Sequence, residues 1–137
     1  MTAKQYLRQL PQIEVRIRRL SDEILERRTK LTSMSLPTLG DKVQTSPGGD
    51  RFADMIASLA DRELYLAEMI DIYRALRDKI VDQIMDLDDA VQADVLYQRY
   101  VQGRQWQEIA DATHYSIQHI FRIHGNALVA FAVKYLK

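Results

Sequence analysis

The stretch "WQEIADATHYSIQHIFRIHGNAL", residues 106–128, contains two helical patterns separated by a turn. Ala110 is small enough for two helices to approach each other closely. His114 stands at the turn, where the backbone must adopt a left-handed conformation, and Ser116 can cap a helix that begins at Ile117. Apolar side chains occupy the positions that a shared core requires, at Ile109, Tyr115, Ile120 and Ile123. This spacing predicts a helix-turn-helix, although an ordinary helical hairpin matches parts of the same pattern.

A further short helix is predicted directly before this motif, in "LDDAVQADVLYQRYVQG". Asp88 or Asp89 can cap its first amides, and Gly103 ends it. The side chains expected to face inward are Val91, Val95, Leu96 and Tyr100. Residues 87–137 are therefore predicted to form a C-terminal helix-turn-helix domain.

The N-terminal part of the chain is predicted to form two long amphipathic helices, residues 3–31 and 51–86, joined by a flexible linker at 32–50 that is rich in Pro, Gly, Ser and Thr. The apolar positions of the second helix step by three and four residues, with interruptions, through Phe52, Ile56, Leu59, Leu66, Ile70, Tyr73, Ile80 and Ile84. A helix of this length spans about 54 Å, which is too long for a compact core. Residues 1–86 are therefore predicted to form a long helical hairpin or a coiled coil, within an all-α chain.

Charge is balanced over the whole chain but not along it. Nineteen Lys and Arg residues match nineteen Asp and Glu residues. Residues 1–31 carry a net charge of +4, from eight basic and four acidic side chains, whereas residues 51–86 carry −3, from five and eight. Opposite signs favour docking of the two helices, within one subunit or between subunits, although each helix can also simply present a solvated charged face.

Several classes of function are disfavoured by what the sequence lacks. It contains no cysteine, no apolar run near the roughly 20 residues of a membrane span and no signal-peptide core, so we expect a cytoplasmic protein without a membrane partner. It has no phosphate-binding glycine loop, no zinc-protease motif and no cysteine nucleophile, so we expect neither an enzyme nor a bound cofactor. His119 and His124 are five residues apart, a poor spacing for two metal ligands on a helix.

The C-terminal third resembles the domain of bacterial sigma factors that reads the −35 promoter element, known as region 4. The residues that carry this resemblance are Leu96, Arg99-Tyr100, Gly103, Glu108-Ile109-Ala110, Ser116 and Ala127-Leu128. From "YLRQL" through the "DKVQTSPGGD" linker to this end, the whole chain is similar to a family of small sigma-like late transcriptional regulators of the RinA/ArpU type, from phages and prophages of Gram-positive bacteria.

The resemblance implies that the helix capped by Ser116 enters the major groove of double-stranded DNA. The residues it assigns to that interface are Ser116, Ile117, Gln118, His119, Phe121 and Arg122. Gln118 would then read adenine and Arg122 guanine or a phosphate, while Ile117 or Phe121 would touch a thymine methyl group and His119 would donate to a base or phosphate. It also implies action with RNA polymerase in a bacterial host cell.

The charge near this helix suits DNA only modestly. No acidic side chain follows Asp111, while Arg122, Lys134 and Lys137 remain, with three histidines as further donors. So few phosphate contacts predict weak, salt-sensitive binding, and therefore either a second DNA-binding copy or a protein partner. A homo-oligomer, most simply a dimer held by the long helices, would supply the copy, with half-sites about 34 Å apart or a multiple of this. Two other functions fit the pattern: a DNA-packaging protein like a small terminase subunit, and a polymerase-binding module that does not touch DNA.

Overall fold

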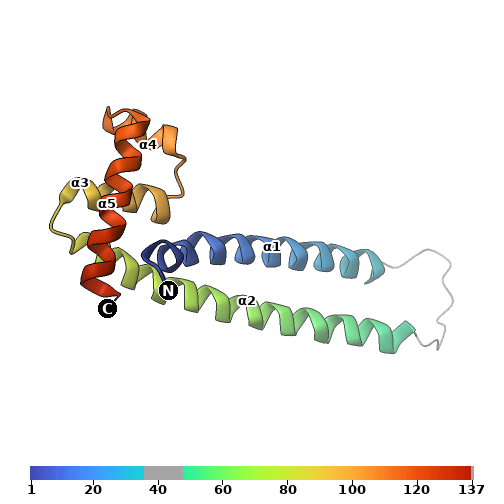
Figure 1. The fold of residues 1–137 in the computed structure, drawn as a ribbon. Helices are drawn as coiled ribbons and strands as arrows, with labels where there is room; N and C mark the ends of the chain where they lie inside the picture. Colours follow the sequence, from blue (N-terminus) through green and yellow to red (C-terminus); the bar gives the residue numbers. More distant parts are fainter. Residues whose placement is uncertain (36–47, 137) are drawn as a thin grey trace. The chain divides into compact units, whose positions relative to one another are not determined.

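All regular structure in the described part of the chain is helical. The computed structural model describes residues 1–35 and 48–136 (Figure 1). Its elements are α1 (Ala3–Ser35), α2 (Gly48–Met85), α3 (Ala90–Leu96), the π-helix η1 (Tyr97–Val101), α4 (Trp106–Thr113) and α5 (Ile117–Tyr135). The predicted all-α class is therefore confirmed. Within these residues no helix has the length and apolarity needed to cross a membrane.

Both ends of the predicted linker at residues 32–50 are helical in the structure. Helix α1 continues to Ser35 and α2 begins at Gly48, so the linker prediction was too long. Residues 32–35 contain neither Pro nor Gly, and the hydroxyl of Thr32 donates to the Arg28 carbonyl (2.9 Å) along the helix. The remaining residues of the predicted linker, 36–47, lie outside the described residues.

The chain divides into two compact units. Unit 1 contains Met1–Glu14 and Ile72–Lys137, and unit 2 contains Val15–Asp71. This division differs from the predicted boundary between residues 86 and 87. The physical reason is that the start of α1 and the last turns of α2 bury their apolar side chains in the same core as α3, η1 and α5.

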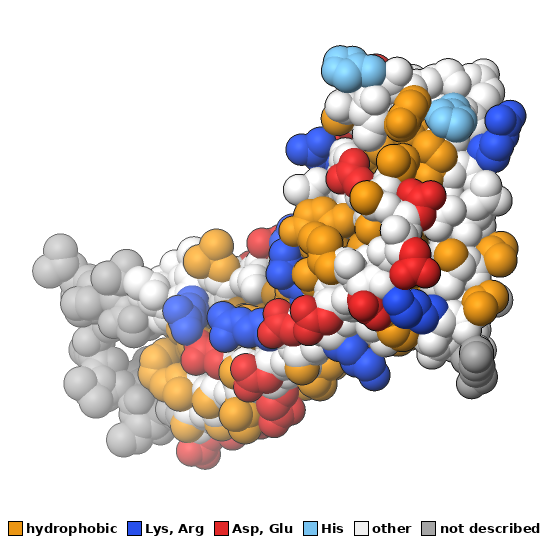
Figure 2. Space-filling model, turned by 90° about the vertical axis from the view of Figure 1, so that its left-hand side faces the viewer, with side chains coloured by type: hydrophobic (Ala, Val, Ile, Leu, Met, Phe, Trp, Pro, Cys, Tyr) orange, Lys and Arg blue, Asp and Glu red, His pale blue; other side chains and the backbone are white. Residues whose placement is uncertain are grey.

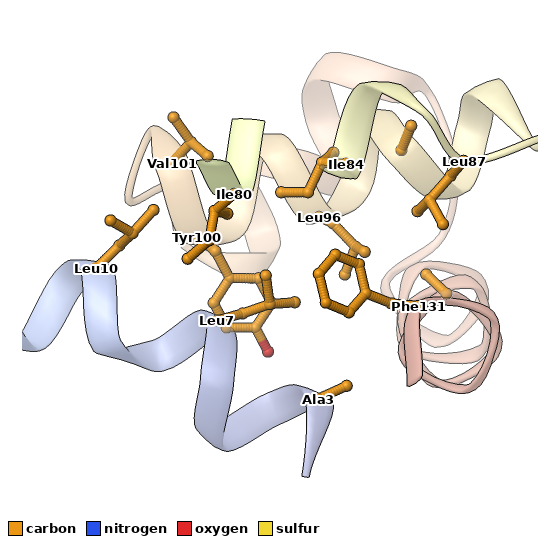
Figure 3. Close-up of a cluster of buried hydrophobic side chains, with 12 residues drawn as sticks. Ala3, Leu7, Leu10, Ile80, Ile84, Leu87, Leu96, Tyr100, Val101 and Phe131 are labelled. Carbon is orange, nitrogen blue, oxygen red and sulfur yellow. The ribbon is translucent and has the colours of Figure 1, made fainter. Parts of the chain in front are cut away.

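The core of unit 1 is built around Phe131, which is fully buried on α5. Its ring points toward Leu7 of α1 and Leu96 of α3 (Figure 3), and it contacts Tyr6 with ring centroids 5.8 Å apart. The other buried members are Ala3, Leu10, Ile80, Ile84, Leu87, Ala93, Tyr100, Val101 and Ala127. Burying one large apolar side chain contributes about 1.5–3 kcal/mol, so this shared core holds five helical segments together.

Unit 2 consists of an antiparallel pair made by parts of α1 and α2. Arg28 donates to Glu63 (Nε to Oε1, 2.9 Å), and Arg62 pairs with Glu23 (3.3 Å). The helices of opposite charge therefore pair within this chain. Because these side chains are substantially exposed, each pair contributes only about 0–1 kcal/mol. Ile56, one of the apolar positions of the second predicted helix, is 47% exposed.

The connection from α2 to α4 is short and capped. Asp89 accepts hydrogen bonds from the amides of Val91 and Gln92, which confirms the second of the two predicted caps. Val91, predicted to face inward, is 39% exposed, because it lies in the first turn of α3 next to the exposed Asp89 and Ala90. Gly103 follows η1 with φ of +70° and ends the helical segment, as predicted.

The two glycines of unit 1 should respond in opposite ways to the same substitution. Gly103→Ala forces a side chain into the left-handed region and should lower the free energy of unfolding by about 1–2 kcal/mol. Gly125→Ala places a methyl group on helix α5, where no atom lies within 4 Å, and should raise it by about 0.5–1 kcal/mol. Urea unfolding followed by circular dichroism measures both changes, and a shift of the same sign in both variants contradicts the described backbone.

Candidate nucleic-acid interface

The turn between α4 and α5 has the predicted backbone. His114 adopts the left-handed conformation, with φ of 61° and ψ of 28°, and the amide of Tyr115 donates to the Ala110 carbonyl (3.2 Å). The hydroxyl oxygen of Ser116 accepts from the amide of His119 (3.1 Å), so Ser116 caps α5. Both local predictions, the turn residue and the cap, are confirmed.

A small cluster of buried side chains holds α4 against α5. It consists of Val95, Ile109, Ala110 and Ile120, with Trp106, Ile117 and Ile123 packed at its edge. Tyr115, predicted to belong to this core, is instead 40% exposed, and its ring meets His119 edge-on with centroids 4.8 Å apart. It follows the left-handed residue directly, so its ring lies over the first turn of α5, where the phenol group stays hydrated.

The first two turns of α5 leave most of the predicted interface residues at the surface. Ser116, Gln118, Phe121 and Arg122 are exposed, whereas Ile117 and His119 are half-buried. Phe121 is 47% exposed, a large fraction for a phenylalanine. Figure 2 shows histidine and hydrophobic side chains together at the surface in the upper part of the view. The six residues thus lie at the cap and in the first two turns of α5, and the side chain of Ile117 is partly buried.

The positive charge around this surface is smaller than the sequence predicted. Lys134 pairs with Asp86 (3.0 Å), and its hydrogen bond to Asp86 raises the pKa of Lys134. Lys137 lies outside the described residues, and His124, expected as a further donor, is buried. Arg122 is therefore the main cation on this surface, and two exposed carboxylates, Glu108 and Asp111, lie on the preceding helix.

An aromatic cluster lies directly behind the exposed residues of α5. The indole ring of Trp106 meets the ring of Phe121 edge-on (5.3 Å) and that of His124 (4.6 Å). The guanidinium of Arg99 lies 4.3 Å from the centre of the Trp106 ring and donates to the Arg104 carbonyl (3.1 Å). These contacts connect η1, α4 and α5, so they fix the direction of α5 relative to α4.

His124 is a buried structural residue that the sequence analysis did not identify. Its Nε2 shares a hydrogen bond with the hydroxyl of Tyr100 (2.7 Å), and burial, with the nearby charges of Lys4 and Arg99, lowers the pKa of His124 to about 4. The ring is therefore neutral at pH 7. The burial of His124 could have been predicted from its spacing in the sequence. Ile120, His124, Ala127 and Phe131 recur at intervals of four, three and four residues, and all four are buried.

A second buried polar residue lies in η1. The amide nitrogen of Gln98 donates to Asp94 (2.7 Å), while its oxygen accepts from Arg104 (3.1 Å). The wider π-helical turn is closed by the amide of Gln102 donating to the Tyr97 carbonyl (3.0 Å). No spacing rule predicts a π-helix in "YQRYV", so the sequence contained no usable signal for this network.

Metal ligands do not converge in the described residues. Within residues 1–35 and 48–136, no three His, Asp or Glu side chains are grouped so that they could hold an ion.

The sequence matches no protein-family model, and comparisons with curated proteins and with solved structures find no match.

The buried His124 should make stability depend on acidity. Its pKa is lower in the folded than in the unfolded chain, where it is about 6.5, so the unfolded state takes up the proton first. This contribution to stability is complete above pH 6.5 and is lost as the pH falls from about 6.5 to about 4. His124→Gln should flatten the pH dependence of the urea midpoint in this window. Equal pH dependence in wild type and His124→Gln contradicts a buried neutral ring.

Proposed function

We propose that this chain is a DNA-binding transcription regulator of the phage and prophage type, acting with RNA polymerase, in which α4, the turn at His114 and α5 form a sigma-like helix-turn-helix. The observation that carries this proposal is the helix begun by Ser116, which leaves Gln118, Phe121 and Arg122 in solvent while its opposite face is buried. A helix presented in this way can enter a groove without any unfolding.

The dimensions of α5 suit the major groove. A helix with its side chains is about 10–12 Å across, and the major groove of B-DNA is about 12 Å wide. Gln118, Phe121 and Arg122 are three and four residues apart, so they share one face of α5. Their chemistry is also that of base reading: an amide for adenine, a guanidinium for guanine and an apolar ring for a thymine methyl group.

The cluster behind α5 supports the same function. The contacts of Trp106 with Arg99, Phe121 and His124 join three elements, so the exposed helix is held in one orientation. A recognition surface that is already ordered loses less conformational entropy on binding. With so few cations, sequence reading must supply a large share of the affinity, and a second copy or RNA polymerase must supply the rest.

Loss of the two polar side chains should weaken sequence-specific binding. Duplexes enriched from a random library by the wild-type chain provide the probe, and fluorescence polarisation measures affinity. We expect Gln118→Ala and Arg122→Ala each to weaken binding to the enriched duplex by about tenfold to a hundredfold. The matched controls are Gln12→Ala and Arg74→Ala, which remove exposed side chains of the same types from α1 and α2. Failure to enrich any sequence, or equal affinities for all four variants, contradicts the proposal.

A second candidate function is a module that binds RNA polymerase without touching DNA. The observation that favours it is the composition of the surface between residues 105 and 133. Arg122 is the only Lys or Arg there, against Glu108 and Asp111, while Tyr115 and Phe121 are 40% and 47% exposed. Exposed aromatic side chains with few charges are typical of the centre of protein interfaces.

The two candidates differ in what Phe121 contributes. If α5 binds polymerase alone, Phe121→Ala should weaken binding to purified host RNA polymerase by about tenfold or more, since aromatic anchors often contribute 2 kcal/mol. In that case the chain alone should bind no duplex even at low salt, where electrostatic attraction is strongest. Biolayer interferometry with immobilised polymerase, with and without DNA, measures both. Retention of polymerase affinity in Phe121→Ala contradicts this second function.

A further inference from the structure

Unit 2 buries very little apolar surface within one chain. Of its described residues only Leu20, Ile24 and Met69 are buried hydrophobic side chains, while the core of unit 1 contains many more. Leu25 on α1 is 64% exposed and Ile56 on α2 is 47% exposed. Helices gain most of their stability in proteins from packing of an apolar face, so this pair leaves a large part of that gain unused.

An apolar stripe of α2 borders its contact with α1 and is only partly covered by it. Its apolar members are Phe52, Ile56, Leu59, Leu66 and Ile70, which keep a spacing of four and three residues if Glu63, which interrupts the stripe, is counted as a position. Such a heptad pattern is typical of a helix that packs against other helices along its length. Every member is nevertheless half-buried or exposed, and none is fully buried by α1. The stripe therefore has contact with α1 on one edge and solvent on the other.

A groove opens where this stripe meets α1. It has a volume of about 360 Å³ and is lined by Ser21, Ile24, Leu25, Arg28, Glu63 and Leu66. Its floor is apolar, and the ion pair between Arg28 and Glu63 bridges the two helices beside it. In a bundle of more than two helices, side chains of another helix would fill this groove.

The two helices that border the groove carry opposite charges. In unit 2, the α1 segment has six basic and three acidic side chains, a net charge of +3, and the α2 segment has two and six, a net charge of −4. A second copy of the same pair offers the complementary arrangement: an acidic helix for α1 and a basic helix for α2.

We infer that the groove of unit 2 is covered by unit 2 of a second copy of this chain, which forms an antiparallel four-helix bundle in which α1 of each copy lies against α2 of the other. A twofold axis parallel to the helices produces this arrangement and makes every neighbouring pair unlike in charge. A twofold axis across the helices would place α1 against α1 and α2 against α2, where like charges repel. This inference is independent of any DNA binding.

The oligomeric mass of the chain without DNA tests the inference. Analytical ultracentrifugation of the full chain should give twice the monomer mass of 15.9 kDa, dissociating on dilution. Leu25→Glu places a carboxylate in the groove, opposite the acidic α2 of the partner, and should weaken dimerisation by at least about tenfold. The matched control is Leu64→Glu, because Leu64 is 62% exposed in the same unit but neither lines the groove nor belongs to the stripe. Since both leucines are exposed in one chain, far-ultraviolet circular dichroism should show that both variants remain helical.

Three outcomes would overturn the inference. These are a wild-type chain that stays monomeric up to about 100 μM, an assembly larger than a dimer, and equal weakening by Leu25→Glu and Leu64→Glu. Salt tests the orientation separately: unlike neighbours predict a dimer that weakens as ionic strength rises, and a dimer that strengthens with salt contradicts the packing of α1 against α2.

Discussion

The buried stripe of α5 is the contact on which the rest of unit 1 depends. Phe131 and Ala127 pack into the core shared with α1, α2 and α3, while Ile120 packs against α4. Between them, His124 bonds to Tyr100 of η1. One helix face therefore joins both hydrophobic clusters, and the opposite face of the same helix is exposed.

The buried and exposed faces of α5 therefore differ in their chemistry. The buried side chains of α5 are apolar or neutral, because burial lowers the pKa of His124 and keeps its ring uncharged. The exposed side chains of its first turns carry little charge, with Arg122 as the main cation. In the proposed function, such a surface attracts phosphates only weakly, so discrimination between partners would come from shape and from a few directed contacts. A dimer formed through unit 2 would supply a second copy of that surface without adding charge to it.

Sequence patterns predicted local features well where one residue type decides the backbone. Ser116 caps α5, His114 adopts the left-handed turn and Gly103 ends the preceding segment, as predicted. Predictions of which side chains face inward failed at Val91 and Tyr115, which lie beside a helix cap and a left-handed turn. Tyr115 is exposed although its position in the motif suggested a core. The sequence analysis also did not predict the cation–π contact between Arg99 and Trp106. This contact joins η1 to α4, and no sequence pattern predicts the π-helix η1.

The amino-acid sequence by itself determined the helical class, the helix caps and turns, and the exposure of Gln118 and Arg122 just after a cap. These depend on hydrogen bonds and backbone angles within a few residues, so local composition is sufficient. Only the tertiary structure decided that residues 1–14 share a core with the C-terminal helices, that His124 is buried and that Lys134 is paired with Asp86. These outcomes depend on which distant surfaces meet, because burial and charge pairing are set by neighbours in space rather than in sequence.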